Sequence, residues 1–296
     1  MELRHLRYFV AVAEELHFTR AAERLHIGQP PLSQQIQALE QEVGARLLDR
    51  SRRWVRLTEA GKLFLQDARR ILALAEAATD TARRAERGEI GELRIGFTPS
   101  TLFMPLFPSV INAYRKQFPN VTLTLKEMVT MRQIDAMDQR QLDIGFIRPP
   151  AAEIPRGISL TTLQHDPLTL VAPVNHRLAR KATITISDLA EEAFVMFLQD
   201  VGTGTYPQIL RLCREAGFSP KIAMEAREPS IIIGLVAAGC GISILPESFK
   251  CIRIKGVCYR PISGASAVMQ LMLASRNDAA TPLVTAFQKL AMAFGH

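Results

Sequence analysis

The chain has 296 residues, of which 48% are hydrophobic and 22% are charged. This length and composition predict two or three globular domains and exclude both a disordered chain and a single small module. The 36 Lys and Arg residues and 29 Asp and Glu residues give a formal net charge of +7, so the surface should favour polyanions such as nucleic acid or acidic lipid.

The amino terminus begins directly with a helical pattern. Leu3, Leu6, Phe9, Val12 and Leu16 recur at mixed spacings of three and four residues, which predicts an amphipathic helix over about 3–15. Charged residues interrupt the first turns, so this segment is not a secretory signal. We therefore expect the protein to stay in the cytoplasm.

Two further short helices follow the first. Thr19 is suited to cap a helix that ends near residue 26, with Ala21 and Ala22 on its apolar face. Two prolines then suit the first turn of a third helix, over about 30–43, because the first turn needs no N–H groups from them. The expected buried residues of that helix are Leu32, Ile36, Leu39 and Val43.

Two short helices joined by a tight turn, with adjacent alanines where they cross, form a helix-turn-helix. Residues 17–51 and 55–61 resemble the DNA-binding domain of LysR-type transcriptional regulators. Gly28 departs from the pattern, since the family often has serine there, but glycine also caps helices. The matching residues are Ala21, Ala22, Leu25, Gln29, Pro30, Ser33, Leu39, Glu40, Gly44, Leu47, Leu48, Arg50, Leu57, Thr58, Ala60 and Gly61.

Polar residues at the start and along one side of the third helix are the candidate base-reading groups. Glutamine pairs with adenine in the major groove, proline can touch thymine methyl groups, and serine reaches a base or a phosphate. A solvated polar face is the alternative interpretation. The candidate residues are Gln29, Pro30, Pro31, Ser33, Gln34 and Gln37.

Five arginines within eleven residues form the strongest local concentration of positive charge, at positions 46, 50, 52, 53 and 56. The resemblance implies that residues 51–57 form a wing hairpin, and Arg52 or Arg53 at its tip is suited to a narrow minor groove. Arg50 has a second interpretation, as an internal partner of Asp49 or Glu42.

A long helix is expected from Thr58 onward. Phe64, Ala68, Ile71, Ala75, Ala78 and Ala82 are spaced by four and three residues in alternation, as in the seam of a coiled coil. The family resemblance favours a dimerising linker helix, and a solvated helix packed on its own domain is the alternative. Two glycines then end the helix near residue 90.

Beyond residue 90, strands and helices alternate, which predicts mostly parallel sheets covered by helices. We expect strands at 92–97, 121–128, 142–148, 168–174, 193–198, 221–226 and 242–246. The expected helices lie near 104–117, 130–140, 205–217 and 229–239.

The looser resemblance of this second region is to the family's effector domain. The implied fold class is a winged helix-turn-helix (all-α with a small β wing), then a long linker helix, then an α/β two-lobed effector domain like a periplasmic binding protein. The implied domains are 1–58, 59–89 and 90–296. Lobe one would comprise 92–160 and 265–296 and lobe two 165–260, with crossovers near 161–167 and 260–266.

Hydroxyl groups that follow the strands are candidates for binding a small anion, because α/β sheets form clefts at the carboxyl ends of their strands. Each such residue would serve equally well as an ordinary helix cap. The candidate effector-binding residues are Ser100, Thr101, Thr130, Phe146, Arg148, Phe197 and Thr203.

Motifs for other chemistry are missing from the sequence. Residues 231–246 are too short and too rich in glycine for a membrane span, and their Gly-x-Gly lacks the third glycine of a dinucleotide site. The four cysteines form no CxxC pair, which argues against a zinc site. We expect no cofactor, no metal and no catalytic residue.

The sequence therefore predicts a LysR-type regulator that binds double-stranded DNA and a small, anionic effector, with the resemblance implying a homodimer or dimer of dimers and contact with RNA polymerase. The segments around 127–133 and 142–148 look most like the muconate-responsive subgroup. Three alternatives stay open: a periplasmic-type solute-binding protein with a helical accessory region, an α/β enzyme, and a redox regulator that uses Cys251 and Cys258.

Overall fold

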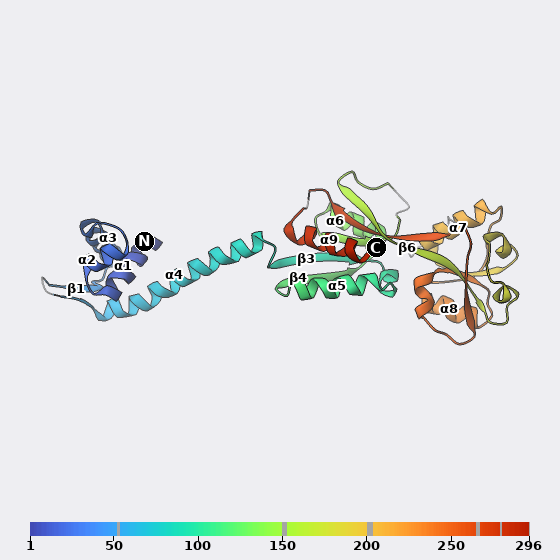
Figure 1. Cartoon of the computed structure of the whole chain (residues 1–296), viewed down its shortest axis with the longest axis horizontal. Coiled ribbons are helices and arrows are strands. Elements are labelled where there is room, and N and C mark those ends of the chain that lie inside the picture. The colour runs from blue at the N-terminus through green and yellow to red at the C-terminus, as the bar shows by residue number, and fades with distance from the viewer. Residues whose placement is uncertain (52–53, 150–152, 200–203, 265–266, 279, 296) are drawn as a thin grey trace. The chain divides into compact units, whose positions relative to one another are not determined.

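The computed structural model describes residues 1–51, 54–149, 153–199, 204–264, 267–278 and 280–295. The chain forms two compact units, Met1–Ala85 and Glu86–His296 (Figure 1). No helix in these ranges combines the length and the hydrophobicity needed to span a bilayer.

The first unit begins with the three expected helices: α1 Leu3–Glu15, α2 Phe18–Arg24 and α3 Gln29–Val43. The predicted cap of α2 is wrong, since the backbone N–H of Arg20 donates to Nδ1 of His17 and Thr19 lies inside the helix. Val43 is also misassigned. It is the last residue of α3, before the left-handed Gly44, and 37% of it is exposed.

The wing consists of β1 Leu48–Arg50 paired antiparallel with β2 Val55–Leu57, so its first strand begins earlier than predicted. Glu40 on α3 holds this hairpin. One carboxylate oxygen accepts the backbone N–H groups of Leu47 (2.9 Å) and Leu48 (3.0 Å). Arg50 donates to the other oxygen, so its internal partner is Glu40 and neither Asp49 nor Glu42.

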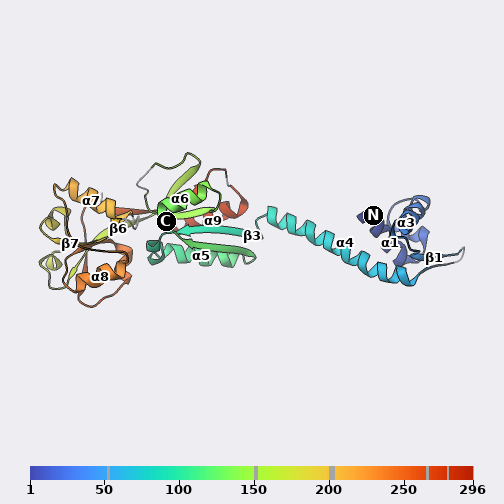
Figure 2. The same cartoon turned by 180° about the vertical axis from the view of Figure 1, so that it is seen from behind.

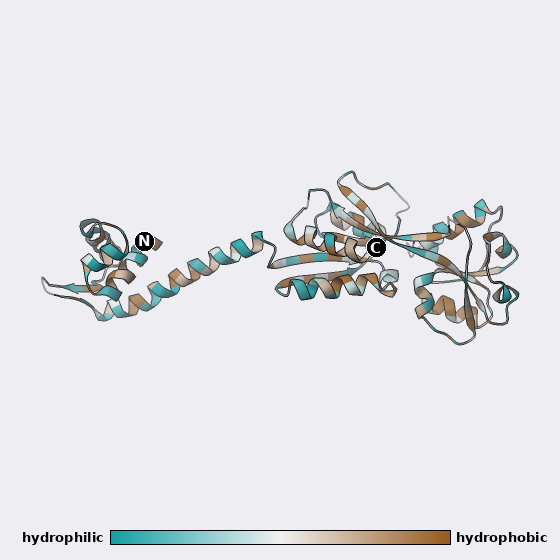
Figure 3. Ribbon diagram, viewed as in Figure 1, coloured by the Kyte–Doolittle hydropathy of each residue, from teal (hydrophilic) through white to brown (hydrophobic). Residues whose placement is uncertain are grey.

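Helix α4 spans Glu59–Glu86 and directly follows Thr58, whose hydroxyl accepts the N–H of Gly61 at 2.9 Å. The first half of the predicted seam is wrong. Ala68 is buried in the core of the first unit, and the Phe64 ring packs edge-on against Phe9 at 5.2 Å. Along α4, hydrophilic turns alternate with hydrophobic patches (Figure 3).

In the second unit, lobe one is built on β3 Gly91–Phe97, β4 Val121–Glu127 and β5 Ile144–Ile147, with β3 parallel to both neighbours. Helices α5 Leu106–Gln117 and α9 Pro282–Gly295 pack on one core of this lobe. Helix α6 Thr130–Asp138 packs on a second core. A short 3-10 helix, η1 Pro99–Phe103, follows β3.

Lobe two contains β7 Ala193–Phe197 parallel to β8 Lys221–Ala226, and β9 Ser243–Pro246 beside them. Helices α7 Thr205–Glu215 and α8 Pro229–Ala237 lie on opposite sides of the lobe in both views (Figures 1 and 2). Lobe two also contains the 3-10 helices η2 Arg177–Arg180, η3 Ile186–Leu189 and η5 Glu247–Cys251.

Two long strand paths join the lobes. Strand β6 Ile158–Pro173 pairs with β11 Val268–Arg276 up to Pro167 and with β9 and β10 Val257–Pro261 from Leu168 onward. The two-lobed α/β architecture is confirmed, but the predicted separate strand at 168–174 is the end of one sixteen-residue strand.

The expectation of mostly parallel sheets is wrong. Over the described residues, the largest sheet has seven strands, and every pairing of β6 in it is antiparallel. The reason is topological, because the chain must run out to lobe two and return. The predicted strands and helices did not include the first half of β6, nor β10, β11 and α9. Within that half of β6, Leu163, Gln164, His165 and Asp166 include no β-branched or aromatic strand former, so the strand signal of Thr161 and Thr162 is interrupted.

Candidate ligand cavity and nucleic-acid interface

A cavity of about 210 Å³ lies between the two lobes of the second unit. Lobe one contributes residues at or just after the ends of β3, β4 and β5. Lobe two contributes residues at the ends of β7 and β8, at the starts of α7 and α8, and in η5. Its described lining residues are Thr98, Pro99, Ser100, Glu127, Val129, Thr130, Arg148, Phe197, Gly204, Thr205, Arg227, Glu228, Pro229 and Phe249.

Arg148 is the buried cation of this cavity, with only 3% of its surface exposed. Its Nε donates to the hydroxyl of Ser100 at 3.2 Å, and its Nη2 donates to Oδ2 of Asp166 at 2.8 Å. Burial lowers the pKa of Arg148, and the carboxylate of Asp166 opposes that shift. The third nitrogen, Nη1, is buried without a hydrogen-bond partner, which is costly for a charged group and suits a ligand anion.

Asp166 connects the two lobes through Arg148, a residue of the cavity wall. It lies on β6, and besides Arg148 its carboxylate accepts the backbone N–H of Ser248 at 3.1 Å and the Ser248 hydroxyl at 2.8 Å. Ser248 belongs to η5 in lobe two, whereas Arg148 follows β5 in lobe one. One buried carboxylate therefore links Arg148 of lobe one to Ser248 of lobe two.

Thr130 orients the backbone of Arg148. Its hydroxyl is 3.3 Å from both the N–H and the carbonyl oxygen of Arg148. Because Thr130 is also the first residue of α6, the start of that helix is held against the residue that carries the buried charge. This arrangement lets Thr130 serve as a helix-end residue and as part of the cavity wall.

Four of the seven predicted effector residues line the cavity: Ser100, Thr130, Arg148 and Phe197. Thr101 and Phe146 do not. Thr101 is fully buried, with its hydroxyl 2.9 Å from that of Thr98, because the turn of η1 directs neighbouring residues differently. Phe146 points into the core of lobe one, where it packs against Phe107. Thr203 lies outside the described residues.

Several lining residues were not predicted from sequence. Glu127 ends β4, Arg227 and Glu228 stand between β8 and α8, and Phe249 lies in η5. Glu127, Arg227 and Glu228 could have been predicted, because the sequence already places them at the ends of predicted strands. Phe249 gave no such signal, since a 3-10 helix after β9 brings it to the cavity.

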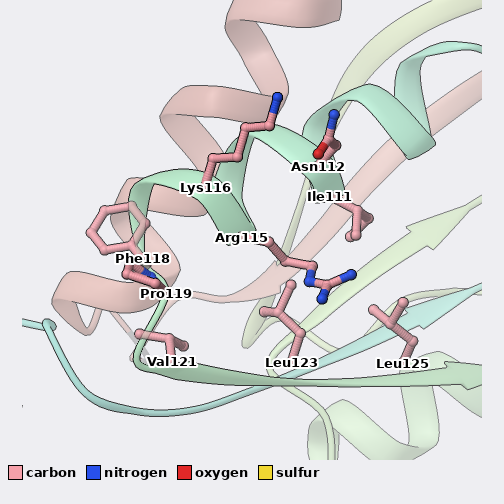
Figure 4. Close-up of a pocket in the computed structure, with 9 residues that line it drawn as sticks. All are labelled: Ile111, Asn112, Arg115, Lys116, Phe118, Pro119, Val121, Leu123 and Leu125. Atoms are coloured by element: carbon pink, nitrogen blue, oxygen red, sulfur yellow. The ribbon is translucent and has the colours of Figure 1, made fainter.

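The second unit also has a larger, open hollow of about 660 Å³ between α5 and β4 (Figure 4). Arg115 extends from α5 toward the strand, and Lys116 points away from it. The polar side chains that line this hollow are exposed, and β4 is the edge strand of its sheet. It therefore lacks the buried polar group that distinguishes the cavity between the lobes.

On the first unit, the predicted base-reading residues form an accessible surface. Gln29, Pro30, Pro31, Gln34 and Gln37 are exposed, and Ser33 is half-buried. They lie opposite the buried Leu32, Ile36 and Leu39 on the same helix. Arg52 and Arg53 lie outside the described residues.

Trp54, the chain's single tryptophan, is a wing residue that the sequence analysis did not single out. It is 44% exposed, and the guanidinium of Arg56 lies 5.0 Å from its ring centroid. Trp54 and Arg56 are two residues apart, so they share one face of the hairpin. An exposed indole with a stacked cation is suited to contact a polyanion that also offers apolar surface.

The two cysteines considered for redox sensing have different environments. Cys251 is exposed in η5, and Cys258 is half-buried on β10. Burial raises the pKa of Cys258, although nearby Arg260 opposes the shift. A raised pKa reduces the thiolate fraction, which opposes the reactivity that a redox switch needs.

Comparison with protein families identifies both parts of the chain. Residues 3–62 match the bacterial regulatory helix-turn-helix model of the lysR family, and residues 86–294 match the LysR substrate-binding domain. The chain is 48% identical over 273 residues to YnfL, an uncharacterized HTH-type transcriptional regulator of Escherichia coli, covering 92% of this chain and 91% of YnfL.

Two solved structures are informative. Full-length CbnR, in a complex with its target DNA, has a TM-score of 0.83 and 30% identity, with 100% of both chains covered. The effector-binding domain of BenM with its effector benzoate has a TM-score of 0.63 and 28% identity. That comparison covers 69% of this chain and 91% of the BenM domain.

Breaking the buried ion pair should destabilise the second unit. Asp166→Asn removes the charge that compensates Arg148, and loss of one partner of a buried pair costs about 3–5 kcal/mol. Ser248→Ala, which removes one neutral donor from the same carboxylate, should cost about 1 kcal/mol. Calorimetric unfolding of both full-length variants tests this; equal costs would show that Asp166 does not stabilise the charge.

Proposed function

The chain belongs to the LysR family of DNA-binding transcriptional regulators, and from this premise we propose that its effector is a small organic acid bound between the two lobes. The protein is a regulator and not an enzyme. We further propose that it acts in the cytoplasm, where its DNA target and RNA polymerase are available.

One observation carries the effector proposal. Nη1 of Arg148 is buried and has no hydrogen-bond partner, while the rest of its guanidinium is held by Ser100 and Asp166. A ligand carboxylate can accept from this nitrogen in a charge-assisted hydrogen bond. The benzoate bound to the BenM effector domain is an organic acid of the same kind.

We propose that the same arginine links binding to regulation. Asp166 ties Arg148 to Ser248 across the lobes, so a ligand that shares the guanidinium changes the strength of an interlobe contact. Such a ligand alters DNA binding or transcription only if its affinity differs between two arrangements of the protein.

For DNA, we propose that the exposed side of α3 enters the major groove, with Gln29, Gln34 and Gln37 among its contacts, and that the wing follows the adjacent minor groove. Arg52 and Arg53 belong to that wing by sequence. The Trp54 and Arg56 stack supports the proposal, because it places an apolar ring and a cation together on the hairpin's outward face.

We propose that α4 forms the dimer contact. Leu63 and Leu74 are 65% and 70% exposed, and their separation of eleven positions makes about three helical turns, so they share one face. The alanines of the second half of α4 allow close approach of a second helix. Dimers, or dimers of dimers, would present two helix-turn-helix units to one operator.

The effector proposal is tested by ligand stabilisation of the full chain. A screen of small organic acids, benzoate included, should find ligands that raise the melting temperature, since a ligand at 100 times its Kd adds about 2.7 kcal/mol. Arg148→Met should abolish that gain. Thr101→Val, which alters a buried hydroxyl outside the cavity, should retain it. Acid stabilisation that persists in Arg148→Met would place the effector elsewhere.

The wing proposal has a built-in reporter, because Trp54 is the chain's single tryptophan. Random-sequence duplex DNA at low salt should shield its fluorescence from acrylamide. Trp54→Ala should weaken DNA binding about two- to fivefold, the range for an exposed cation–π contact. Val174→Ala, which alters an exposed apolar residue of the second unit, should leave DNA binding unchanged. Unchanged quenching together with unchanged affinity would exclude a Trp54 contact.

Dimerisation through α4 predicts a change of mass. Leu74→Glu places a charge in the proposed contact, so the molar mass of the full chain in light scattering should fall. Asp80→Lys changes the charge of an exposed residue on the opposite side of the helix and provides the control. If Leu74→Glu retains the wild-type mass at low micromolar concentration, the contact lies on another surface.

A further inference from the structure

We infer that the cavity between the lobes selects acids with a single carboxylate and discriminates against dicarboxylates, with Glu127 and Glu228 acting as the selecting groups. This inference rests on the proposed function, since it concerns which organic acid the same cavity accepts. It is carried by the distribution of charge over the described lining residues.

The inner part of the cavity has one cation, and that cation is already neutralised. Arg148 and Asp166 are both almost fully buried, and they form an ion pair at 2.8 Å. The pair has no net charge, but Nη1 of Arg148 is a donor without a hydrogen-bond partner. One carboxylate can therefore be held there by hydrogen bonds from Nη1 and the nearby hydroxyls. A second carboxylate finds no second buried cation among the described lining residues.

The outer part of the cavity is different because its charged residues are exposed. Glu127 and Glu228 line it from lobe one and lobe two respectively, together with Arg227. Arg227 already takes part in another interaction. The four charged lining residues sum to zero, and the adjoining Asp166 makes the local total negative. The described residues around a ligand anion in the cavity therefore carry no net positive charge.

The second carboxylate of a diacid would lie toward these exposed carboxylates. An acid whose first carboxylate binds Arg148 must direct its other end away from the buried pair, and Glu127 and Glu228 are the exposed carboxylates among the lining residues it can then approach. Like charges at this range repel, and the partly enclosed cavity screens them less than bulk water does. An uncharged end meets instead the rings of Phe197 and Phe249 and the apolar Val129 and Pro229.

The size of the cavity agrees with a small ligand. Its volume of about 210 Å³ is below the range of roughly 300 Å³ and more that is typical of drug-sized ligands. Short or compact monocarboxylates fit this space and leave their apolar end against the two aromatic rings.

The experiment compares acids of equal chain length that differ by one carboxylate. Butyrate and succinate, hexanoate and adipate, and sorbate and muconate are such pairs. Isothermal titration and thermal shift are measured with the full chain at constant ionic strength. In the pair whose monocarboxylate binds most tightly, we expect that monocarboxylate to bind at least about tenfold more tightly than the diacid of equal chain length.

Charge-neutralising variants test the selecting groups. In Glu127→Gln/Glu228→Gln, the ratio of diacid to monoacid affinity should rise toward one. Glu225→Gln removes an exposed negative charge from β8 outside the cavity and should leave the ratio at its wild-type value. Comparison of the ratio, rather than of one affinity, corrects for any general loss of binding in the double variant.

Each outcome is decisive. Diacids that bind as tightly as their monoacid partners, with both losing affinity in Arg148→Met, would overturn the selectivity and leave the proposed effector site intact. A monoacid preference that persists in the double variant would show that Glu127 and Glu228 are not its source. If no acid of either kind binds in an Arg148-dependent way, the proposed effector function itself is wrong.

Discussion

The buried ion pair of Arg148 and Asp166 is the constraint around which the second unit is arranged. A charged guanidinium is tolerated in a protein interior only if a carboxylate and polar neighbours compensate it. Here the carboxylate comes from the strand that crosses between the lobes, and Ser248 of lobe two shares it. Stability and ligand binding therefore depend on the same few atoms, so a mutation here can affect folding and response together.

The connection between the lobes follows from strand β6. Residues up to Pro167 pair within lobe one, and from Leu168 the same strand pairs within lobe two. Asp166 lies just before that change of partners, where the backbone of one lobe becomes the backbone of the other. A change in the hydrogen bonds of this side chain is thus positioned to alter how the lobes are held. This is a physical route by which a small ligand can influence a regulator.

The first unit shows a comparable arrangement around Glu40. Its carboxylate holds the start of the wing through two backbone N–H groups and through Arg50, whose guanidinium also lies 5.2 Å from the Phe18 ring centroid. Arg50 is consequently occupied inside the protein. The outward face of the hairpin carries Trp54 and Arg56 instead. The sequence alone does not distinguish the arginine that is paired inside the protein, Arg50, from the outward-facing Arg56, because both belong to the same short arginine cluster.

The sequence by itself determined the features that depend on local periodicity. The three short helices, the start of α4 after Thr58, and the strand-end positions of Ser100, Thr130 and Arg148 all follow from spacings within a few residues. Tertiary structure alone decided which of these side chains meet. Thr101 points inward because of the turn of η1, and Phe146 belongs to the core. Asp166, Ser248 and Phe249 reach Arg148 and its cavity because strand register and the return path from lobe two bring together residues about 20 to 100 positions apart. Local patterns hold no information about that register, since it depends on how whole strands pack.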